Sequence, residues 1–430
     1  MDAGLDKVEG ILEKEVAIVD GIDISGPWNR MFEQRVIWEY TPELIEKIAS
    51  LPGAESFAWC YQCAKCVPVC PVDQVGDYGP RKLYRMAQTG VDLLNHDALW
   101  LCTTCMNCVR VCKKVVDMVK IMPAAREQAV LNGFVPEELQ TAFENTAKYG
   151  NPLGQSQRKR AAWTKKSDVP VPIMKDVKRA EVLWYVGSYP SYHPRGIDAS
   201  LAAARIFNAL GVDFAILGRE EKDDGDSQRL AGELGLFEML AEHNLKVFEK
   251  YDWDLMVVTG PHEYNAFKKE YKERFGFDRP IQHYTQFLAD RLDQLKPMLK
   301  HEIPLKVTFH DPCYLGRHHG EYDAPRALLQ AIPGLELVEM GRCRENGYCC
   351  GGGGGGMWLD SFTINHTTMR LSERRVLEAV AYGADVLAVC CPFEVSRFED
   401  AAKSTGNDQL KVLDILELLD MSMRGVGLAA

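Results

Sequence analysis

The sequence lacks the features of a membrane-spanning, a secreted or a nucleic-acid-binding protein. No stretch approaches the roughly 18 uncharged apolar residues of a transmembrane helix, so we expect no such helix. The opening residues, MDAGLDKVEG, are acidic and contain no apolar segment, which predicts that there is no secretory signal peptide. The net charge is −11, from 50 Lys and Arg against 61 Asp and Glu, whereas a general nucleic-acid binder would be basic.

Cysteine, by contrast, is abundant, with 14 residues in a chain of 430. At about 150 residues per domain, such a chain holds roughly two to three domains, each able to form a core without disulfide bonds. In a long chain without a signal peptide, clustered cysteines indicate metal binding or redox chemistry. The cysteines form three groups, which are Cys60, Cys63, Cys66 and Cys70; Cys102, Cys105, Cys108 and Cys112; and Cys313, Cys343, Cys349, Cys350, Cys390 and Cys391.

Patterns along the chain divide it into segments. Residues 1–50 have apolar side chains at mixed helical spacings, which predicts an amphipathic helical segment that packs on its own domain or contacts a partner. Residues 51–135 hold the first two cysteine groups, and residues 136–180 form a linker with proline, glycine and positive charge. From residue 181 onward, short apolar runs alternate with helical stretches, which predicts α/β structure with a largely parallel sheet.

The α/β part contains an internal repeat. The segment EVLWYVGSYPSYHPRG at 181–196 resembles KVTFHDPCYLGRHHGE at 306–321, and the spacings that follow are similar. We therefore expect two pseudo-symmetric α/β domains, 181–300 and 301–430, of which only the second carries cysteines. The repeat places Ser188 opposite Cys313, Asp223 and Asp224 opposite Cys349 and Cys350, and Gly260, Pro261, His262 and Glu263 opposite Cys391, Pro392, Phe393 and Glu394.

The first two cysteine groups share the spacing C-x2-C-x2-C-x3-C, which is typical of two-cluster ferredoxins. There, three cysteines of one run and the last cysteine of the other bind each cubane [4Fe–4S] cluster. A pair of zinc sites is the alternative, but four cysteines in each run with the x3 offset favour iron–sulfur clusters. The predicted metal ligands are Cys60, Cys63, Cys66 and Cys112 for one cluster, and Cys102, Cys105, Cys108 and Cys70 for the other.

The third group contains adjacent cysteine pairs, which do not fit one cubane held by a relaxed loop. They suit an unusual cluster with extra or bridging thiolates. Charged and histidine side chains lie nearby in the sequence, and some are expected to move protons or bind an anionic thiol. The candidate metal ligands are Cys313, Cys349, Cys350, Cys390 and Cys391, and the candidate catalytic residues are Cys313, Cys349, Cys350, Cys391, His318 and His319.

Six glycines, Gly351–Gly356, follow the first cysteine pair of this group. They permit a close approach of the backbone, with N–H groups aimed at sulfur or substrate, and Gly351, Gly352 and Gly353 are the candidate cofactor-binding residues. A flexible surface loop is the alternative. The run also matches G-x-G-x-x-G, but it follows cysteines rather than a strand, which disfavours a dinucleotide site. Cys343 is interpreted as a bystander.

Both cysteine-rich parts resemble subunits of heterodisulfide reductase. CYQCAKCVPVCPV, RKLYRMAQTG and LWLCTTCMNCVRVC are similar to its small iron–sulfur subunit. HDPCYLGRHHGEYDAPR, YCCGGGGGGMW and CCPFE are similar to the cysteine-rich CCG domain of its catalytic subunit. A chain that carries both, over residues 55–425, resembles the fused D-type subunit.

The resemblance implies a helical two-cluster ferredoxin-like module followed by two pseudo-symmetric CCG-type α/β domains, the first of them degenerate. It implies two cubane [4Fe–4S] clusters and one further CCG-type, noncubane [4Fe–4S] cluster that cleaves or forms disulfides. The family closes this last site with C-P-x-C, whereas here Glu394 stands three residues after Cys391. Cys390 or Glu394 would then replace the last thiolate.

A single CCG site is most similar to the DsrK-type catalytic subunit of the membrane-bound Dsr complex of dissimilatory sulfur metabolism. That resemblance implies a cytoplasmic subunit, peripheral on the inner face of the cell membrane, beside a cytochrome b-type quinone-interacting subunit. Electrons from quinol would pass through the cubanes to the CCG-type site, which would reduce or form a disulfide or trisulfide of a small protein or thiol. The alternatives are a non-catalytic electron-transfer subunit between a flavoprotein or CoA reductase and quinone, and a subunit of a 2-hydroxy-acid oxidase.

Overall fold

The computed structural model describes residues 42–426 and two short strands, β1 (Ile18–Val19) and β2 (Ile22–Asp23), which pair antiparallel. The chain forms two units, Met1–Tyr40 and Thr41–Ala430. The amphipathic helical segment predicted over residues 1–50 lies mostly outside the described residues, and α2 (Glu43–Ala49) is the helix described at its end.

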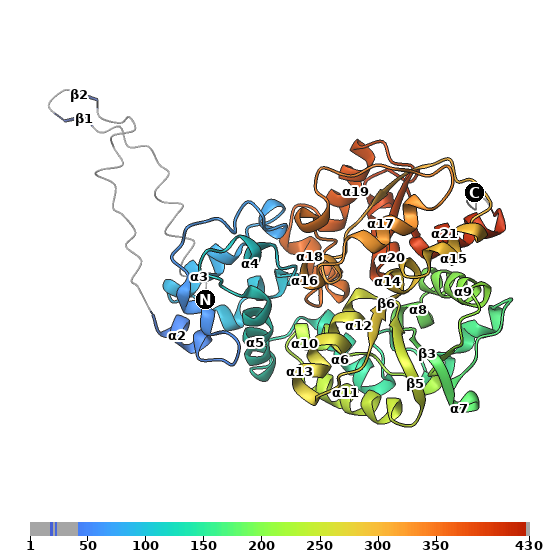
Figure 1. The fold of residues 1–430 in the computed structure, drawn as a ribbon. Coiled ribbons are helices and arrows are strands. Elements are labelled where there is room, and N and C mark those ends of the chain that lie inside the picture. Colours follow the sequence, from blue (N-terminus) through green and yellow to red (C-terminus); the bar gives the residue numbers. More distant parts are fainter. Residues whose placement is uncertain (1–17, 20–21, 24–41, 427–430) are drawn as a thin grey trace. The chain divides into compact units, whose positions relative to one another are not determined.

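Short helices joined by loops form the region that holds the first two cysteine groups (Figure 1). Its core contains Phe57, Leu99 and Trp100, all at most 2% exposed. The longest helix, α5, begins where the Asp117 carboxylate accepts a hydrogen bond from the N–H of Val119 at 3.1 Å. The elements of this region are α2, the 3₁₀ helices η2 (Glu55–Trp59) and η3 (Val72–Gln74), α3 (Pro80–Gln88), η4 (Leu93–Asn95), η5 (Asp97–Leu101), α4 (Asn107–Val111), α5 (Met118–Leu131) and α6 (Glu137–Tyr149).

A connecting segment leads from α6 to the first of two sheets. The strands of this sheet are parallel. A helical connection after each strand returns the chain to the end of the sheet at which the strands begin. The elements are η6 (Gln157–Lys159), η7 (Ala162–Lys166), α7 (Met174–Val177), β3 (Arg179–Tyr185), α8 (Ser188–Tyr192), α9 (Pro194–Ala209), β4 (Phe214–Ile216), η8 (Gly218–Glu220), α10 (Asp226–Leu230), α11 (Leu234–Phe248), β5 (Asp252–Val258), α12 (Pro261–Asn265), the π-helix η9 (Ala266–Glu270), α13 (Tyr271–Phe275), β6 (Ile281–His283), α14 (Tyr284–Ala289), α15 (Leu292–Leu295) and η10 (Lys296–Met298).

The second sheet is parallel as well, and its strand order matches that of the first. The orders are β4-β3-β5-β6 and β8-β7-β9-β10, so each sheet places its first strand between its second and third. The elements are β7 (Lys306–Phe309), α16 (Gly316–His319), α17 (Asp323–Gln330), β8 (Glu336–Leu337), η11 (Arg344–Asn346), η12 (Gly356–Trp358), α18 (Asp360–His366), α19 (Leu371–Ala381), β9 (Val386–Val389), α20 (Pro392–Ser404), β10 (Lys411–Asp414) and α21 (Ile415–Arg424).

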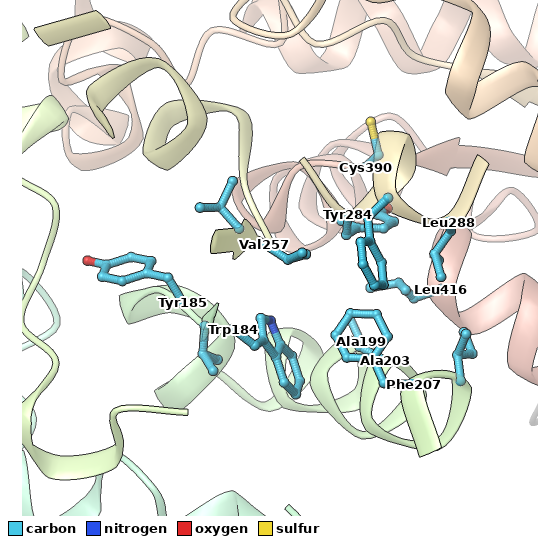
Figure 2. Packing of buried hydrophobic residues seen from close by; sticks show 14 of the residues in the cluster. Trp184, Tyr185, Ala199, Ala203, Phe207, Val257, Tyr284, Leu288, Cys390 and Leu416 are labelled. Carbon is cyan, nitrogen blue, oxygen red and sulfur yellow. The ribbon is translucent and has the colours of Figure 1, made fainter. Parts of the chain in front are cut away.

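The largest hydrophobic core includes residues of both sheet regions. Helix α9 packs on α21, and α14 packs on α17, so helices of the two regions meet (Figure 1). Figure 2 shows Trp184 and Phe207 from the first region in the same cluster as Leu416 from the second. Burying one large apolar side chain stabilises the fold by roughly 1.5–3 kcal/mol, so this shared core ties the two regions together.

None of the helices within residues 42–426 has the length and apolarity that a membrane crossing requires. The longest α-helix there, α9, has 16 residues, whereas a crossing takes about 20.

The carboxyl end of the second sheet positions the third cysteine group. Strand β7 ends at Phe309, and the loop after it reaches Cys313. The neighbouring strand β9 ends at Val389, and Cys391 follows as the N-cap of α20. Open parallel sheets bind ligands at this edge, because the loops that leave adjacent strands converge there.

Candidate functional site

The two cysteine loops of the helical region share one backbone conformation. In the first loop Gln62 and Ala64 have φ angles of 64° and 65°, and in the second Thr104 and Met106 have φ angles of 51° and 69°. Both pairs stand two and four positions after the first cysteine of their motif. Residues other than glycine adopt this left-handed conformation rarely, and it concentrates at functional loops. The matched positions indicate two copies of one binding loop.

The eight cysteines of these loops line two cavities. The sulfur of Cys102 lies 3.4 Å from the backbone N of Thr104, and the sulfur of Cys112 lies 3.4 Å from that of Val116. Backbone N–H groups directed at sulfur are a means by which proteins stabilise bound iron–sulfur clusters. One cavity is lined by Cys60, Cys63, Cys66, Cys108 and Cys112, and the other by Cys70, Cys102, Cys105 and Cys108, so Cys108 borders both. Each cavity therefore brings together cysteines of both loops, and the crossed ligand assignment stays a prediction.

The two cavities differ in their access to solvent. Cys63 at the first cavity is exposed, whereas Cys70 and Cys105 at the second are buried. The backbone N–H of Lys65 lowers the pKa of Cys63, and burial raises the pKa of Cys70 to about 12. The first cavity therefore has the greater access to solvent.

A third group of thiols lies against the second cysteine loop. Cys313, Cys349 and Cys350 are between 1% and 7% exposed, and Cys349 stands at the centre of the group. The thiols of Cys105, Cys313 and Cys350 donate hydrogen bonds to its sulfur, which holds the pKa of Cys349 well below its usual range. Cys105 of the second loop thus contacts the third group directly.

The glycine run directs its first N–H groups at the third group of thiols. The N of Gly351 lies 3.3 Å from the sulfur of Cys349, and the N of Gly352 lies 3.4 Å from the sulfur of Cys350. Gly351 has a φ of +85°, which is accessible to glycine without strain. Gly351 and Gly352 are two of the three predicted cofactor-binding glycines. Their N–H groups point to the place where a group bound to these sulfurs would lie.

The next glycines pack against the second cysteine loop. A Cβ on Gly353 would stand 2.5 Å from the carbonyl oxygen of Thr103, and a Cβ on Gly354 would collide with the carbonyl oxygen of Cys102. Gly354 also has a φ of +62°. Any larger residue would force the third site away from the second cysteine loop, so the glycine run sets their spacing.

Arg126 joins three parts of the chain beside this contact. Its guanidinium is fully buried and donates to the carbonyl oxygens of Leu99 at 3.0 Å, Cys102 at 2.6 Å, Leu230 at 2.9 Å and Gly354 at 2.8 Å. Within the part of the chain that the structure describes, these hydrogen bonds go to backbone carbonyls and none goes to a carboxylate. Burying a cation without an anion is costly, so Arg126 fits an anionic group bound next to Cys102.

Arg317 brings a second buried cation to the third site. Its Nε donates to the carbonyl oxygen of Cys105 at 2.6 Å, and its Nη1 donates to that of Gly347 at 2.7 Å. Its Nη2 is buried and donates to none of residues 42–426. Although burial acts to lower it, the thiols of Cys105 and Cys313 hold the pKa of Arg317 above its usual value. The free donor fits an anionic cluster or a thiolate at this place.

His310, Cys350 and Glu394 bring three different metal-binding atoms together at the third site. One donor atom of each lies within 4.8 Å of the others, and all three residues are buried. Glu394 lies in the first turn of α20, three residues after Cys391. His310 Nε2 lies 3.3 Å from Glu394 Oε1. Burial raises the pKa of Glu394 well above its ordinary value.

The two histidines that the sequence pointed to lie nearby but bond elsewhere. His318 Nε2 donates to the carbonyl oxygen of Thr104 at 3.1 Å, and its ring stacks on Tyr314 with centroids 4.0 Å apart. His319 Nε2 lies 3.1 Å from Asn265 Oδ1. Burial lowers the pKa of His318 to about 3 and that of His319 to about 4, so both rings are neutral at pH 7.

Two cysteines stand apart from the third group of thiols. Cys343 is half-buried, and burial together with the carboxylate of Glu339 raises its pKa. Cys390 belongs to the large hydrophobic core, in the same cluster as Tyr284 and Leu416 (Figure 2). Its adjacency to Cys391 in the sequence thus does not bring it to the group around Cys349.

Sequence reasoning missed Arg126 altogether. Arg126 lies on the buried face of α5, on which Met122 and Ala129 also lie. A charged residue at an apolar position of a helical pattern was the available signal, because such a residue needs a specific buried partner. His310 was noted only as one of several polar neighbours, because its approach to Glu394 depends on the pairing of β7 with β9.

The chain matches two protein families over the regions that carry the cysteines. Residues 56–116 match a 4Fe-4S dicluster domain, and residues 307–393 match a cysteine-rich domain. With 14 cysteines in the three groups, the chain fits two cubane [4Fe–4S] clusters and one CCG-type cluster.

Three relatives illustrate what this chain is similar to. It is 32% identical to the D-type subunit of the dihydromethanophenazine:CoB–CoM heterodisulfide reductase of Methanosarcina mazei, over 88% of this chain and 97% of that protein. It is 38% identical to the probable iron-sulfur-binding oxidoreductase FadF of Bacillus subtilis, over 78% of this chain and 48% of that protein. It is 32% identical to the EtfAB:quinone oxidoreductase of Syntrophomonas wolfei, over 77% of this chain and 47% of that protein. The chain therefore spans about half the length of the last two.

Proposed function

The chain belongs to the family of the D-type heterodisulfide reductase subunits and is an iron–sulfur oxidoreductase of that type, and we propose that its reaction is the reduction or formation of an S–S bond in a small thiol or a small sulfur-carrying protein. Reducing such a bond takes two electrons and two protons and releases two thiols. When bound, the cubanes supply one-electron carriers, and the CCG-type cluster supplies the site at which sulfur exchanges electrons.

One observation supports this proposal above the others: the sulfur of Cys349 in the third group lies 3.4 Å from Oγ1 of Thr103 in the second cysteine loop. The three groups of thiols thereby follow one another from the exposed Cys63 to the buried Cys349. A partner that reaches Cys63 has a continuous route inward, and the burial of Cys349 keeps water from the reacting sulfur. Arg317, with its free Nη2, is placed to hold a thiolate there.

The pseudo-symmetric pair of CCG-type domains, 181–300 and 301–430, is part of the proposal. It is supported by the shared strand order of the two sheets. It is also supported by Ser188, whose hydroxyl donates to Asp223 Oδ2 at 2.6 Å, as the thiol of Cys313 donates to Cys349 at the matching place. The first half has oxygen-bearing side chains where the second half has thiols, so we expect only the second half to bind a cluster.

A second candidate is electron transfer without sulfur chemistry, between a flavoprotein or CoA reductase and quinone. It is favoured by the similarity to a protein named EtfAB:quinone oxidoreductase. In that case the third group of thiols would hold one more relay. Thiols and disulfides would then leave its spectroscopic signal unchanged.

For the first candidate we propose the setting of the DsrK-type subunit. The subunit would bind a membrane cytochrome b-type quinone-interacting subunit and would lie on the inner face of the cell membrane through its partner subunits. Quinol would deliver electrons near Cys63, the exposed member of the first group. Isolation of the native complex from membranes, followed by identification of its subunits, tests this setting.

Replacing Cys349 with Ser tests the proposed function directly. Reduced viologen serves as the electron donor, and CoB–CoM heterodisulfide and a panel of small disulfides serve as probes. We expect Cys349→Ser to lower the rate of disulfide reduction by more than about 100-fold. The reason is that loss of a metal ligand lowers activity more than loss of a residue that only hydrogen-bonds to a ligand. The cubane EPR signals after dithionite reduction should persist.

Cys343→Ser is the matched control, since Cys343 lies apart from the third group. It should retain turnover. Full turnover by Cys349→Ser would contradict the proposal, and so would equal losses in both variants.

A further inference from the structure

The third site lacks one thiolate where the protein places a carboxylate. Cys391 is the N-cap of α20, and Glu394 lies in the first turn of this helix. The backbone N–H of Glu394 donates to the carbonyl oxygen of Cys391 at 2.9 Å, which holds the two residues close together at the start of the helix. The N-terminal end of a helix also favours anionic groups such as a thiolate and a carboxylate. Glu394 thus stands where a cluster-binding side chain is needed.

The Glu394 carboxylate is not fully hydrogen-bonded within the described residues. Its side chain is 1% exposed, and its Oε2 accepts a hydrogen bond from none of the described residues. A buried carboxylate without a cation or sufficient donors is strongly disfavoured. A cation at Oε2 would remove this penalty, and Cys350 is within the same 4.8 Å group of donor atoms.

His310 does not compete with this carboxylate as a ligand. Arg375 Nε donates to His310 Nδ1 at 3.1 Å, so the hydrogen of the neutral ring lies on Nε2. A ring nitrogen that carries a hydrogen cannot bind a metal, but it can donate. His310 Nε2 lies 3.3 Å from Glu394 Oε1, which leaves the other oxygen, Oε2, free.

Cys390 is a poor replacement for the missing thiolate. Its side chain is 0% exposed and belongs to the apolar cluster that contains Tyr284, Leu288 and Leu416 (Figure 2). Cys350, by contrast, belongs to another cluster, which contains Val389 and Phe398. Turning Cys390 toward Cys350 would leave a gap in the large core.

We propose that Glu394, through Oε2, is an iron ligand of the cluster held by Cys313, Cys349, Cys350 and Cys391. The inference rests on the third cluster of the proposed function. A carboxylate is a harder ligand than a thiolate, and soft thiolates bind iron–sulfur sites well. An added thiol would therefore compete with Glu394 for the iron that Glu394 binds. The four cysteines would stay bound to the other irons.

The test compares Glu394→Gln, Glu394→Cys and Glu263→Gln in full-length, anaerobically purified protein labelled with ⁵⁷Fe. Glu263 is the matched control, because it is a buried carboxylate three residues into the first half's Gly260-Pro261 segment, as Glu394 is after Cys391. The readouts are iron content, Mössbauer spectra and EPR of the thiol-oxidised state. The EPR signals of the dithionite-reduced cubanes report in each sample that the chain is folded.

We expect Glu394→Gln to lower the iron content and to remove or shift the oxidised-state signal, while Glu263→Gln matches the wild type. Glu394→Cys should keep the iron and show a changed spectrum that no longer responds to an added thiol. Wild-type spectra and iron content in Glu394→Gln would overturn the inference, and lost turnover with those spectra would make Glu394 a proton donor. Wild-type iron accounted for by two cubanes alone would also overturn it.

The inference and the proposed function fail in different ways. If an added thiol leaves the wild-type signal unchanged while Glu394→Gln alters it, the ligand assignment stands and the sulfur chemistry fails. If the thiol changes the signal equally in wild type and Glu394→Gln, the sulfur chemistry stands and the ligand assignment fails.

Discussion

Arg126 places a full positive charge in the interior, next to the backbone of Cys102. Four carbonyl oxygens, from Leu99, Cys102, Leu230 and Gly354, accept its hydrogen bonds. These carbonyls belong to the helical region, the first sheet region and the glycine run. One side chain therefore ties the second cysteine loop to the rest of the fold and adds positive charge where an anionic cluster fits.

Replacing Arg126 with Met should affect both stability and redox behaviour. We expect a loss of about 1.5–3 kcal/mol in the free energy of unfolding, because buried carbonyl acceptors lose a charged hydrogen-bond donor. The reduction potential of the second cubane should become more negative, because less positive charge faces its added electron. Calorimetry and an EPR-monitored redox titration measure the two effects.

Arg126→Lys separates the two effects, since lysine keeps the charge but cannot make the same set of hydrogen bonds. It should destabilise the protein while leaving the potential close to that of the wild type. An unchanged potential in Arg126→Met would show that the charge does not act on the cluster.

At the scale of elements, side-chain caps fix where helices begin. His283 ends β6 and caps α14, with its Nδ1 2.7 Å from Thr285 Oγ1. The Gln286 side chain accepts from the N–H of His283 at 3.1 Å, which completes a capping box. Helix α14 packs on α17, so this cap also supports the contact between the two sheet regions.

The His283 cap makes stability sensitive to acid. Burial lowers the pKa of His283 to about 3, whereas an unfolded histidine titrates near 6.5. Between these values the unfolded chain binds the proton and the folded chain does not, so stability falls as the pH falls from about 6.5 toward 3. His283→Asn, which keeps a good N-cap without a titrating group, should lose less stability over this range.

Thermal midpoints measured from pH 7 to pH 4 for wild type and His283→Asn check this expectation. The midpoint of the wild type should fall more steeply. Parallel curves would show that His283 contributes nothing to the acid sensitivity.

Short-range patterns in the sequence were enough to predict much of the fold and of the candidate site. The α/β alternation predicted from residue 181 onward is present as two parallel sheets, since apolar runs and helical periodicity are short-range signals. The C-x2-C-x2-C spacing predicted two binding loops, and Gln62 and Thr104 take the same left-handed conformation in them. Glu394 could be singled out from the sequence, because it stands where the resembling family closes the motif C-P-x-C with a cysteine.

Long-range contacts could not be read from the chain. The approach of Cys105 to Cys349 depends on how the helical region packs on the second sheet region, and residue spacing holds no information on that packing. The role of Arg126 could not be predicted for the same reason, because it also depends on long-range packing. The prediction that His318 and His319 act as acid and base rested on their nearness to Cys313 in sequence, and the structure gives them hydrogen bonds to Thr104 and Asn265.

At the scale of the whole molecule, the thiols form a series that runs from the surface to the interior. Cys63 is exposed, Cys105 is buried, and Cys349 is 1% exposed. In the proposed function, the electron route ends where water is excluded and where Arg317 has a free donor. The central claim is that sulfur chemistry takes place at this end.

Anaerobic EPR of the thiol-oxidised protein, with and without an added small thiol such as coenzyme M or coenzyme B, tests that claim most directly. Oxidised ferredoxin-type cubanes give no EPR signal, so a signal from the oxidised protein reports on the third site. The account predicts such a signal in the wild type, a change in it on adding the thiol, and its loss in Cys349→Ser. A signal that ignores every thiol, or only cubane signals after reduction, would contradict the account and favour an electron relay.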